Sequence, residues 1–328
     1  MGARLPPALE AAIEQRLVGV SRADLAERAA RISGHYRAQG ASSAVVRAEA
    51  DAAAYALSRL PATYAAVDAA FEAIAERAPE FAPATVLDIG AGPGGASWAA
   101  VEQWPDVVAV ALLDSNRAFL ALAAELARSS DHPALAASRP VLADFRALTA
   151  PPEPADLVIA SYALAEVGVS DAVETARTLW GLARGVLVVV EPGTPAGFER
   201  IAAARSALIA DGGAVLAPCP HAEACPITAP AWCHFNRRLP RSRDHRLVKG
   251  ASAPFEDEKF AYVALARPDL RTRGAGERVM STPRVTKVEA AYRACTPAGL
   301  VDRRIPRRER ERFVRARRLH WGDWAEDG

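Results

Sequence analysis

The sequence predicts an α/β protein in which a parallel sheet with crossover helices follows a purely helical N-terminal segment. Short apolar runs recur at 85–92, 107–114, 156–163 and 185–193, and helical stretches separate them. Strands that alternate with helices in this way favour a parallel sheet. Residues 1–80 contain no such run, so the helical segment comes first and the sheet after it.

Helical periodicity describes the N-terminal segment. The stretch SRADLAERAARISGHYRAQ follows a potential cap, Ser21, and repeats its apolar residues at helical spacing. Residues 52–81 predict two helices with a break at Pro61, because proline lacks the amide proton that an interior helical position needs. We therefore expect a helical module over 1–80.

Two later strand candidates, 259–267 and 287–295, could form an antiparallel pair that closes the sheet. A proline-rich loop with three cysteines, 217–235, lies before both of them. The expected organisation is then a sheet domain over 81–270, which includes this loop, and a closing strand with a basic C-terminal extension over 271–328.

Composition places the chain among ordinary soluble globular proteins. It has 328 residues, 51% of them hydrophobic and 24% charged. No apolar run approaches the roughly 18–20 residues that a membrane span needs, and the N-terminus lacks the apolar core of a signal peptide. We expect a cytoplasmic protein without a membrane partner, in which disulfides are disfavoured because cytosolic thiols stay reduced.

Positive charge is concentrated at the C-terminal end, although the net charge of the chain is only +1. From Arg267 onward there are 16 Lys and Arg against 9 Asp and Glu, a difference of +7. The densest part is RRIPRRERERFVRARR, 303–318. Such a segment is either a solvated helix face or a surface that contacts RNA.

The stretch VLDIGAGPGGASWAA carries the signature of a nucleotide-type ligand. Gly90, Gly92 and Gly94 follow a predicted strand and precede a predicted helix, where glycines permit a tight turn and close approach of a ligand. Asp88 stands two residues before the first glycine. Asp114 ends the next strand, where an acid can bind ribose hydroxyls.

Two cofactor classes fit an acid at that position. A nicotinamide dinucleotide requires G-x-G-x-x-G to seat its pyrophosphate, whereas this chain has G-A-G-P-G-G. A carboxylate beside the loop suits a ligand with a cationic amino acid better than a pyrophosphate. The layout resembles the Rossmann-like class I S-adenosylmethionine-dependent methyltransferases. That resemblance implies that Asp88 and Gly90 to Gly94 face the methionine part, Asp114 the ribose and Asp144 the adenine amine.

No catalytic residue can be named from the sequence. After the fourth strand the chain reads SYALAEVG, 161–168, without a recognisable amine-binding motif and without a cysteine nucleophile. Methyl transfer depends mainly on positioning, because the sulfonium already carries the chemistry, so this absence does not exclude catalysis. Tyr162 is expected to be a wall of the pocket.

The cysteines predict a metal site. Their spacing is Cys219-x5-Cys225-x7-Cys233-x61-Cys295, and these four are all the cysteines of the chain. Structural zinc usually uses ligand pairs two to four residues apart, which none of these spacings matches. An iron–sulfur cubane takes four thiolates at wider separations. Zinc stays the alternative, with His221 and His234 as substitute ligands, since spacing alone indicates a metal without choosing it.

Four stretches together resemble one family: YALSRLPATYAAV; LDIGAGPGGASWAA; CPHAEACPI with WCHFNRRLPRS and FEDEKFAYVAL; and the terminal WGDW. The chain is similar to the bacterial branch of the small-ribosomal-subunit methyltransferase-like proteins, whose mitochondrial members are ribosome-assembly factors. The resemblance covers roughly 5–324. It implies bound S-adenosylmethionine, a [4Fe–4S] cluster held by Cys219, Cys225, Cys233 and Cys295, and a role on the small ribosomal subunit and its 16S rRNA.

Two functions follow from this resemblance. The first is a methyltransferase that acts on the RNA of the small subunit. The second is a non-catalytic assembly factor whose cofactor and cluster stabilise an RNA-binding surface. A radical enzyme is disfavoured, because radical chemistry uses C-x3-C-x2-C and leaves one iron open.

Overall fold

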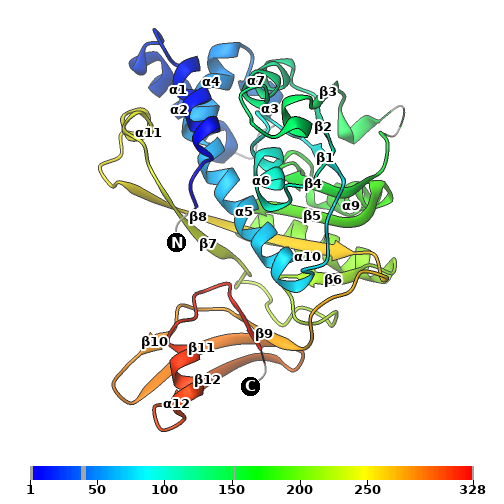
Figure 1. Cartoon of the computed structure of the whole chain (residues 1–328), viewed down its shortest axis with the longest axis vertical. Coiled ribbons are helices and arrows are strands. Elements are labelled where there is room, and N and C mark those ends of the chain that lie inside the picture. The colour runs from blue at the N-terminus through cyan, green and yellow to red at the C-terminus, as the bar shows by residue number, and fades with distance from the viewer. Residues whose placement is uncertain (1–2, 38–41, 149, 151, 327–328) are drawn as a thin grey trace.

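A computed structural model describes residues 3–37, 42–148, 150 and 152–326 of the chain (Figure 1). A large mixed sheet lies between two helical layers, and a smaller sheet follows at the C-terminal end. The described elements, in chain order, are α1 (Pro7–Arg16), α2 (Arg22–Arg37), α3 (Ser42–Val45), α4 (Glu49–Ser58), α5 (Leu60–Arg77), β1 (Thr85–Ile89), α6 (Gly95–Gln103), β2 (Ala109–Asp114), α7 (Arg117–Ala127), α8 (Pro133–Ala136), β3 (Arg139–Leu142), η1 (Phe145–Ala147), β4 (Ala155–Ser161), η2 (Leu164–Glu166), α9 (Val169–Leu182), β5 (Ala183–Pro192), α10 (Pro195–Ala210), β6 (Ala214–Ala217), β7 (Phe235–Pro240), α11 (Arg243–Lys249), β8 (Phe255–Ala266), β9 (Gly276–Val279), β10 (Arg284–Val285), β11 (Glu289–Thr296), β12 (Gly299–Pro306), α12 (Arg310–Ala316) and β13 (Trp324–Glu326).

The large sheet has the strand order β3-β2-β1-β4-β5-β8-β6, with β7 also paired to β8. Strands β1 to β5 run parallel, and β8 is antiparallel to β5. The order reverses between β1 and β4, which is the place where ligands bind in open α/β sheets. This order, with an antiparallel strand beyond β5, confirms the predicted fold class, a Rossmann-like class I methyltransferase sheet.

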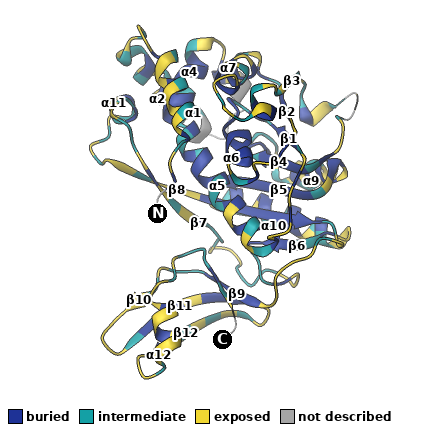
Figure 2. Ribbon diagram, viewed as in Figure 1, coloured by how far each residue is buried: buried dark blue, intermediate teal, exposed yellow. Residues whose placement is uncertain are grey.

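Successive residues of the central strands face two different cores. Val86, Leu157 and Val188 pack on the side of helices α1 to α7, whereas their neighbours Leu87 and Val158 pack with α9 and α10. This alternation is the period of two that a strand imposes on its side chains. Both faces are covered, which explains why these strands read as continuous apolar runs in the sequence. Figure 2 shows the central strands buried along most of their length.

The helices before β1 form as the sequence predicts. Helix α4 ends at Ser58 and α5 begins at Leu60, so the predicted break lies beside Pro61, which stands in the first turn of α5. Proline is tolerated there because the first turn has no amide partner to lose. The last two residues of the helix predicted over 21–39, residues 38 and 39, lie outside the described residues. The domain limits at 80 and 270 stay predictions.

The pairing expected for residues 287–295 is wrong. They overlap β11, which belongs to a second sheet of order β10-β11-β9-β13, with β12 also paired to β11. Its core is formed with α12. Strands β6 and β7, which were not expected, pair with successive halves of β8. The cysteine loop joins them, so it leaves the large sheet at one edge and faces the smaller sheet.

Within the described residues, no helix combines the length and the apolar character needed to cross a membrane.

Candidate functional site

The glycine loop lies between β1 and α6 and turns through left-handed backbone. Gly90, Gly92 and Gly94 have φ of 64°, 54° and 86°, a region that L side chains rarely adopt. A Cβ on Gly90 would lie 2.9 Å from the Cβ of Ala163, whereas a Cβ on Gly92 would meet no heavy atom within 4 Å. The backbone at Gly92 therefore faces open space that a ligand can enter.

Asp114, the last residue of β2, is tied directly to this loop. The amide of Gly92 donates to its Oδ2 over 2.8 Å, and the amide of Asn116 donates to its Oδ1 over 2.7 Å. Burial raises the pKa of Asp114 to about 6, although these amide donors oppose the shift. The structure thus brings together the two most specific elements of the predicted site, the glycine turn and the acid of the second strand.

Asp88 lies behind the loop. Its side chain is buried, its Oδ2 accepts from the hydroxyl of Ser97 on α6 over 2.8 Å, and its Oδ1 has no hydrogen-bond partner. Burial raises the pKa of Asp88 to about 7. One oxygen of a buried carboxyl is thus left without a partner beside the loop, which is compatible with a ligand that supplies a donor.

Asp144 follows β3 and caps the short helix η1. Its two oxygens accept from Nε and Nη2 of Arg146 over 2.8 and 2.7 Å, and the bonds to Arg146 lower its pKa. Its neighbour Ala143 donates its amide to the carbonyl of Asp114, which places Asp144 at the same edge of the sheet. An adenine amine would have to share this carboxylate with Arg146.

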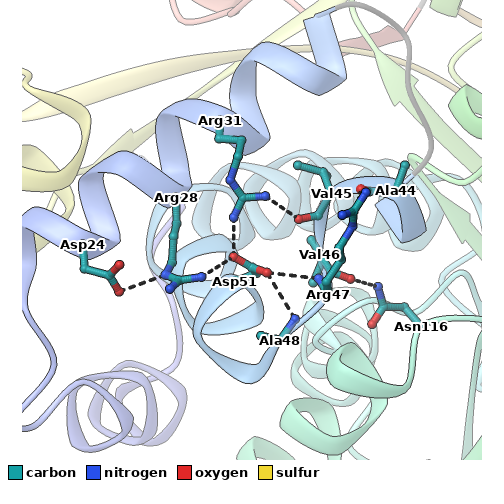
Figure 3. A network of polar contacts seen from close by, with 10 residues as sticks. All are labelled: Asp24, Arg28, Arg31, Ala44, Val45, Val46, Arg47, Ala48, Asp51 and Asn116. Carbon is teal, nitrogen blue, oxygen red and sulfur yellow. Dashed lines mark hydrogen bonds and ion pairs between the residues drawn. The ribbon is translucent and has the colours of Figure 1, made fainter.

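A polar network that sequence analysis did not identify connects Asn116, whose backbone amide binds Asp114, to the N-terminal helices. Figure 3 shows this network from Asn116 to Asp24. The side-chain amide of Asn116 donates to the carbonyl of Val46 over 2.8 Å. Next to Val46, the amides of Arg47 and Ala48 donate to Oδ2 of Asp51 over 3.0 and 3.1 Å.

Asp51 in turn binds two arginines of α2. Its Oδ1 accepts from Arg28 over 2.8 Å and also from Arg31. Burial opposes the charge of Asp51, but these bonds keep its pKa below the usual value. Hydrogen bonds therefore run from α2 to the acid of β2. The residues are too far apart in the sequence for spacing to reveal this connection.

Tyr162 lies directly after β4 and is the non-glycine residue with positive φ among those described, at 59°. Its hydroxyl donates to Oε1 of Glu258 over 2.8 Å, and Nη2 of Arg59 lies 3.6 Å from the same oxygen. Burial raises the pKa of Tyr162 well above 10. A buried phenol that donates to a carboxylate is a poor general base, and the role of Tyr162 as a wall of the pocket stays a prediction.

The four cysteines converge although 61 residues separate the third from the fourth. Cys219, Cys225 and Cys233 of the loop and Cys295 of β11 line one small cavity together with His221 and Arg278. All four are free thiols. The structure thus brings together the complete predicted ligand set from two different sheets.

The two histidines of the loop differ in position. Nε2 of His221 lies 3.6 Å from Sγ of Cys295. His234 instead packs against Trp232 and Trp321, with ring centroids 5.4 and 4.9 Å apart. Of the two alternative ligands, His221 is thus the one at the cavity.

The surroundings of the thiols are buried and positively charged. Burial raises the pKa of Cys219, Cys233 and Cys295, the last to about 12, and the neighbouring thiols add to the increase. The guanidinium groups of Arg205 and Arg278, both buried, act in the opposite direction. They would offset the negative charge of bound thiolates.

Among the described residues, no three His, Cys, Asp or Glu side chains are arranged to hold one metal ion. Tetrahedral zinc with bonds of about 2.3 Å would bring its sulfur ligands to about 3.8 Å from one another. In a cubane each thiolate binds a different iron, so the sulfurs stand further apart.

Comparison with known proteins gives a family and a relative. The family model for the mitochondrial small ribosomal subunit protein Rsm22 matches residues 49–325. The human mitochondrial ribosome assembly protein METTL17 is 30% identical over 294 residues, which cover 82% of this chain. The match spans 61% of the human protein, less than two thirds of its length.

Among solved structures, the chain is similar to methyltransferases at low identity. The magnesium protoporphyrin IX methyltransferase of Synechocystis is 16% identical, with a TM-score of 0.41 over 63% of this chain and 80% of that one. An S-adenosylmethionine-dependent methyltransferase of Leishmania major is 15% identical, with a TM-score of 0.39 over 63% and 78%.

Proposed function

The chain belongs to the Rsm22 family of the mitochondrial small ribosomal subunit, and from this premise we propose that it binds S-adenosylmethionine and acts on the small ribosomal subunit. The observation that carries the proposal is the contact between Gly92 and Asp114, which joins an open glycine turn to the acid at the end of β2. The relative METTL17 is a ribosome assembly protein, which supports the ribosomal partner.

For the cofactor, the residues fit in three respects. The turn at Gly92 faces open space, Asp114 offers acceptors for ribose hydroxyls, and Asp88 has one unpartnered oxygen beside the loop. Bound S-adenosylmethionine supplies a methyl group already activated by the sulfonium. The task of the chain is then to hold the cofactor at the carboxyl ends of β1 and β2 and to orient it.

For the metal, we propose a [4Fe–4S] cluster bound by Cys219, Cys225, Cys233 and Cys295. Support comes from the convergence of four free thiols on one cavity and from Arg205 and Arg278, which offset negative charge there. Such a cluster would connect the cysteine loop with β11 of the smaller sheet. Zinc remains the competing metal, with His221 as a possible ligand.

For the RNA, the C-terminal arginines offer a contact surface. Residues 307–318 carry exposed arginines of which six make no ion pair within the described part of the chain: Arg307, Arg308, Arg310, Arg315, Arg317 and Arg318. Unpaired surface arginines suit phosphate groups. The arginines of β7 are less suited, because Arg237 and Arg238 already pair with carboxylates.

Two experiments test this proposal. Calorimetric titration with S-adenosylmethionine asks whether the cofactor binds, and analysis of iron, sulfide and zinc after anaerobic purification asks which metal the cysteines hold. Absence of cofactor binding would overturn the first part, and zinc without sulfide would overturn the second.

Catalysis is tested separately. Transfer of tritium from labelled S-adenosylmethionine to 16S rRNA or to assembling small subunits identifies a methyltransferase. Binding to the subunit without transfer identifies a non-catalytic assembly factor.

A further inference from the structure

A second cavity, of about 900 Å³, lies beside the proposed cofactor site. Its wall includes η2 and the end of β5, and helices α2 and α11 close it from the opposite side. Strand β4 neighbours β1 in the sheet, and Ala163 packs against Gly90 of the glycine loop, two residues before the wall begins at Ala165. We call this cavity the basic pocket.

Its lining presents far more positive than negative charge. Arg59, Arg200, Arg241 and Lys249 line the pocket, against one lining carboxylate, Glu166, among the described residues. The other parts of the lining are mainly small apolar side chains from α2, η2, β5, α10 and α11. A ligand that matches this wall has an anionic group and a flat apolar portion.

The carboxylates that pair with these cations stand behind the wall. Nζ of Lys249 lies 2.7 Å from both oxygens of Glu256, and Nε of Arg241 lies 3.1 Å from the same side chain. Neither this glutamate nor the partner of Arg59, Glu258, belongs to the lining. The cations are thus held in place from behind while their pocket side is open to a ligand.

Arg200 has the weakest partner of the four. Its Nη1 lies 3.7 Å from Oε2 of Glu191, which is fully buried and has no hydrogen bond at that oxygen. Burial raises the pKa of Glu191 to about 8. At 3.7 Å and without a hydrogen bond at Oε2, this carboxyl compensates the charge of Arg200 only weakly. The N-terminus of the 16-residue helix α10, at Pro195, opens on the same pocket and adds a favourable dipole.

From this geometry we propose that the basic pocket binds a nucleotide through its phosphate group, with Arg200, Arg241 and Lys249 as the phosphate contacts. The volume is far larger than a phosphate ion needs and lies in the range of pockets for nucleotide-sized ligands. The small apolar side chains leave room for base and ribose. The inference depends on the proposed function in one respect only: with S-adenosylmethionine at the glycine loop, the nucleotide in the basic pocket is a second ligand.

The nucleotide has two possible sources, an RNA strand or the free nucleotide pool. Titration of the full chain with each nucleoside 5′-monophosphate tests the free nucleotide. Titration with a labelled single-stranded RNA hexanucleotide tests the strand. Either signal counts for the pocket only where a pocket variant changes it, because the C-terminal surface also attracts phosphates.

Three variants make the test specific. Lys249→Gln removes one phosphate contact and should weaken nucleotide or RNA binding about tenfold. Glu256→Gln removes the negative charge that pairs with Lys249 and Arg241 and should strengthen nucleotide or RNA binding severalfold. If the Lys249–Glu256 pair served only to stabilise the fold, both variants would bind more weakly than the wild type. Arg177→Gln, on exposed α9 and outside the lining, should match the wild type. Thermal unfolding of each variant shows whether it is folded.

The outcomes separate this inference from the proposed function. Nucleotide binding with the opposite responses of Lys249→Gln and Glu256→Gln supports the pocket, whether or not S-adenosylmethionine binds. Normal binding of S-adenosylmethionine together with no response of nucleotide or RNA binding to either variant overturns the pocket alone. No binding of any monophosphate or hexanucleotide also overturns it.

Discussion

At the scale of single residues, we propose that Asp114 has two tasks. It holds the glycine turn through Gly92 and would accept the ribose hydroxyls of the cofactor. A charge-assisted hydrogen bond contributes about 1.5–3 kcal/mol. Asp114→Ala should therefore weaken S-adenosylmethionine binding by about tenfold or more, as measured by calorimetry. The exposed Asp131→Ala provides the control, and equal affinities for both variants would remove Asp114 from the site.

The pKa of Asp114 predicts how cofactor binding depends on pH. Burial raises this pKa to about 6, so the carboxylate is present above pH 6 and becomes protonated as the pH falls through that value. Protonation removes an acceptor for the ribose, and affinity should decline below about pH 6. Asp114→Asn should bind weakly with a flatter pH profile. An unchanged profile would assign the titration to another group, of which Asp88 is the nearest candidate.

At the scale of elements, most of the strands that the sequence revealed are buried on both faces. Strands β1, β2, β4 and β5 appear as apolar runs, and the glycine turn follows from residue type. Strand β7, FNRRLP, lies at the edge of the sheet, alternates polar and apolar residues and contains proline. It therefore lacks the apolar run from which the other strands were predicted. Strand β11 was recognised but assigned to the wrong sheet, because its composition does not encode which strand it pairs with.

The same limit applies to the candidate site. The glycines, Asp114 and the four cysteines could be named from local patterns. The Asp51 network (Figure 3), the Tyr162–Glu258 contact and the basic pocket could not, because each joins residues from separate elements that lie far apart in the sequence. Only the folded chain brings them together.

The Asp51 network should control how firmly α2 is held. Asp51 is buried and binds both Arg28 and Arg31, so Asp51→Asn leaves two arginines without their carboxylate, at a cost of about 1–3 kcal/mol. Hydrogen exchange of the α2 amides should accelerate. Asp24→Asn is the matched control, since it removes an exposed partner of the same Arg28, a loss of less than about 1 kcal/mol. Equal exchange in both variants would contradict the network's role.

At the scale of the whole molecule, the four cysteines line one cavity with residues that come from both sheets. Three belong to the loop at the edge of the large sheet and Cys295 belongs to β11. If all four bind one cluster, Cys295→Ser and Cys225→Ser should lose similar amounts of iron and similar thermal stability, by several kcal/mol for a link that closes so long a loop. His234→Ala, packed between two tryptophans, should keep its iron. Full iron in Cys295→Ser would direct attention to His221 as the fourth ligand.

The exposed arginines of 307–318 belong to the smaller sheet and its helix α12, and we expect them to contact the ribosomal subunit. Arg307, Arg308 and Arg315 are exposed. The first two lie between β12 and α12 and the third lies on α12, a helix that Figures 1 and 2 show at the smaller sheet. Reversing all three to glutamate should weaken association with the small subunit and make it less dependent on salt. Each lost phosphate contact reduces the slope of log affinity against log salt concentration by about 0.7–0.9. Cofactor affinity should not change.

A charge-matched control separates a specific surface from a general effect of net charge. Arg128, Arg139 and Arg177 are also exposed but lie much earlier in the sequence, in or near α7, β3 and α9. Reversing these three arginines to glutamate changes the net charge by the same amount. Sucrose-gradient sedimentation with small subunits at two salt concentrations compares both triple variants with the wild type. Retention of the wild-type profile by the C-terminal reversal, or an equal loss in both triples, would exclude α12 and its flanks as the RNA surface. Loss in the C-terminal reversal alone would place the subunit contact there, away from the glycine loop, because the two sites lie on different sheets.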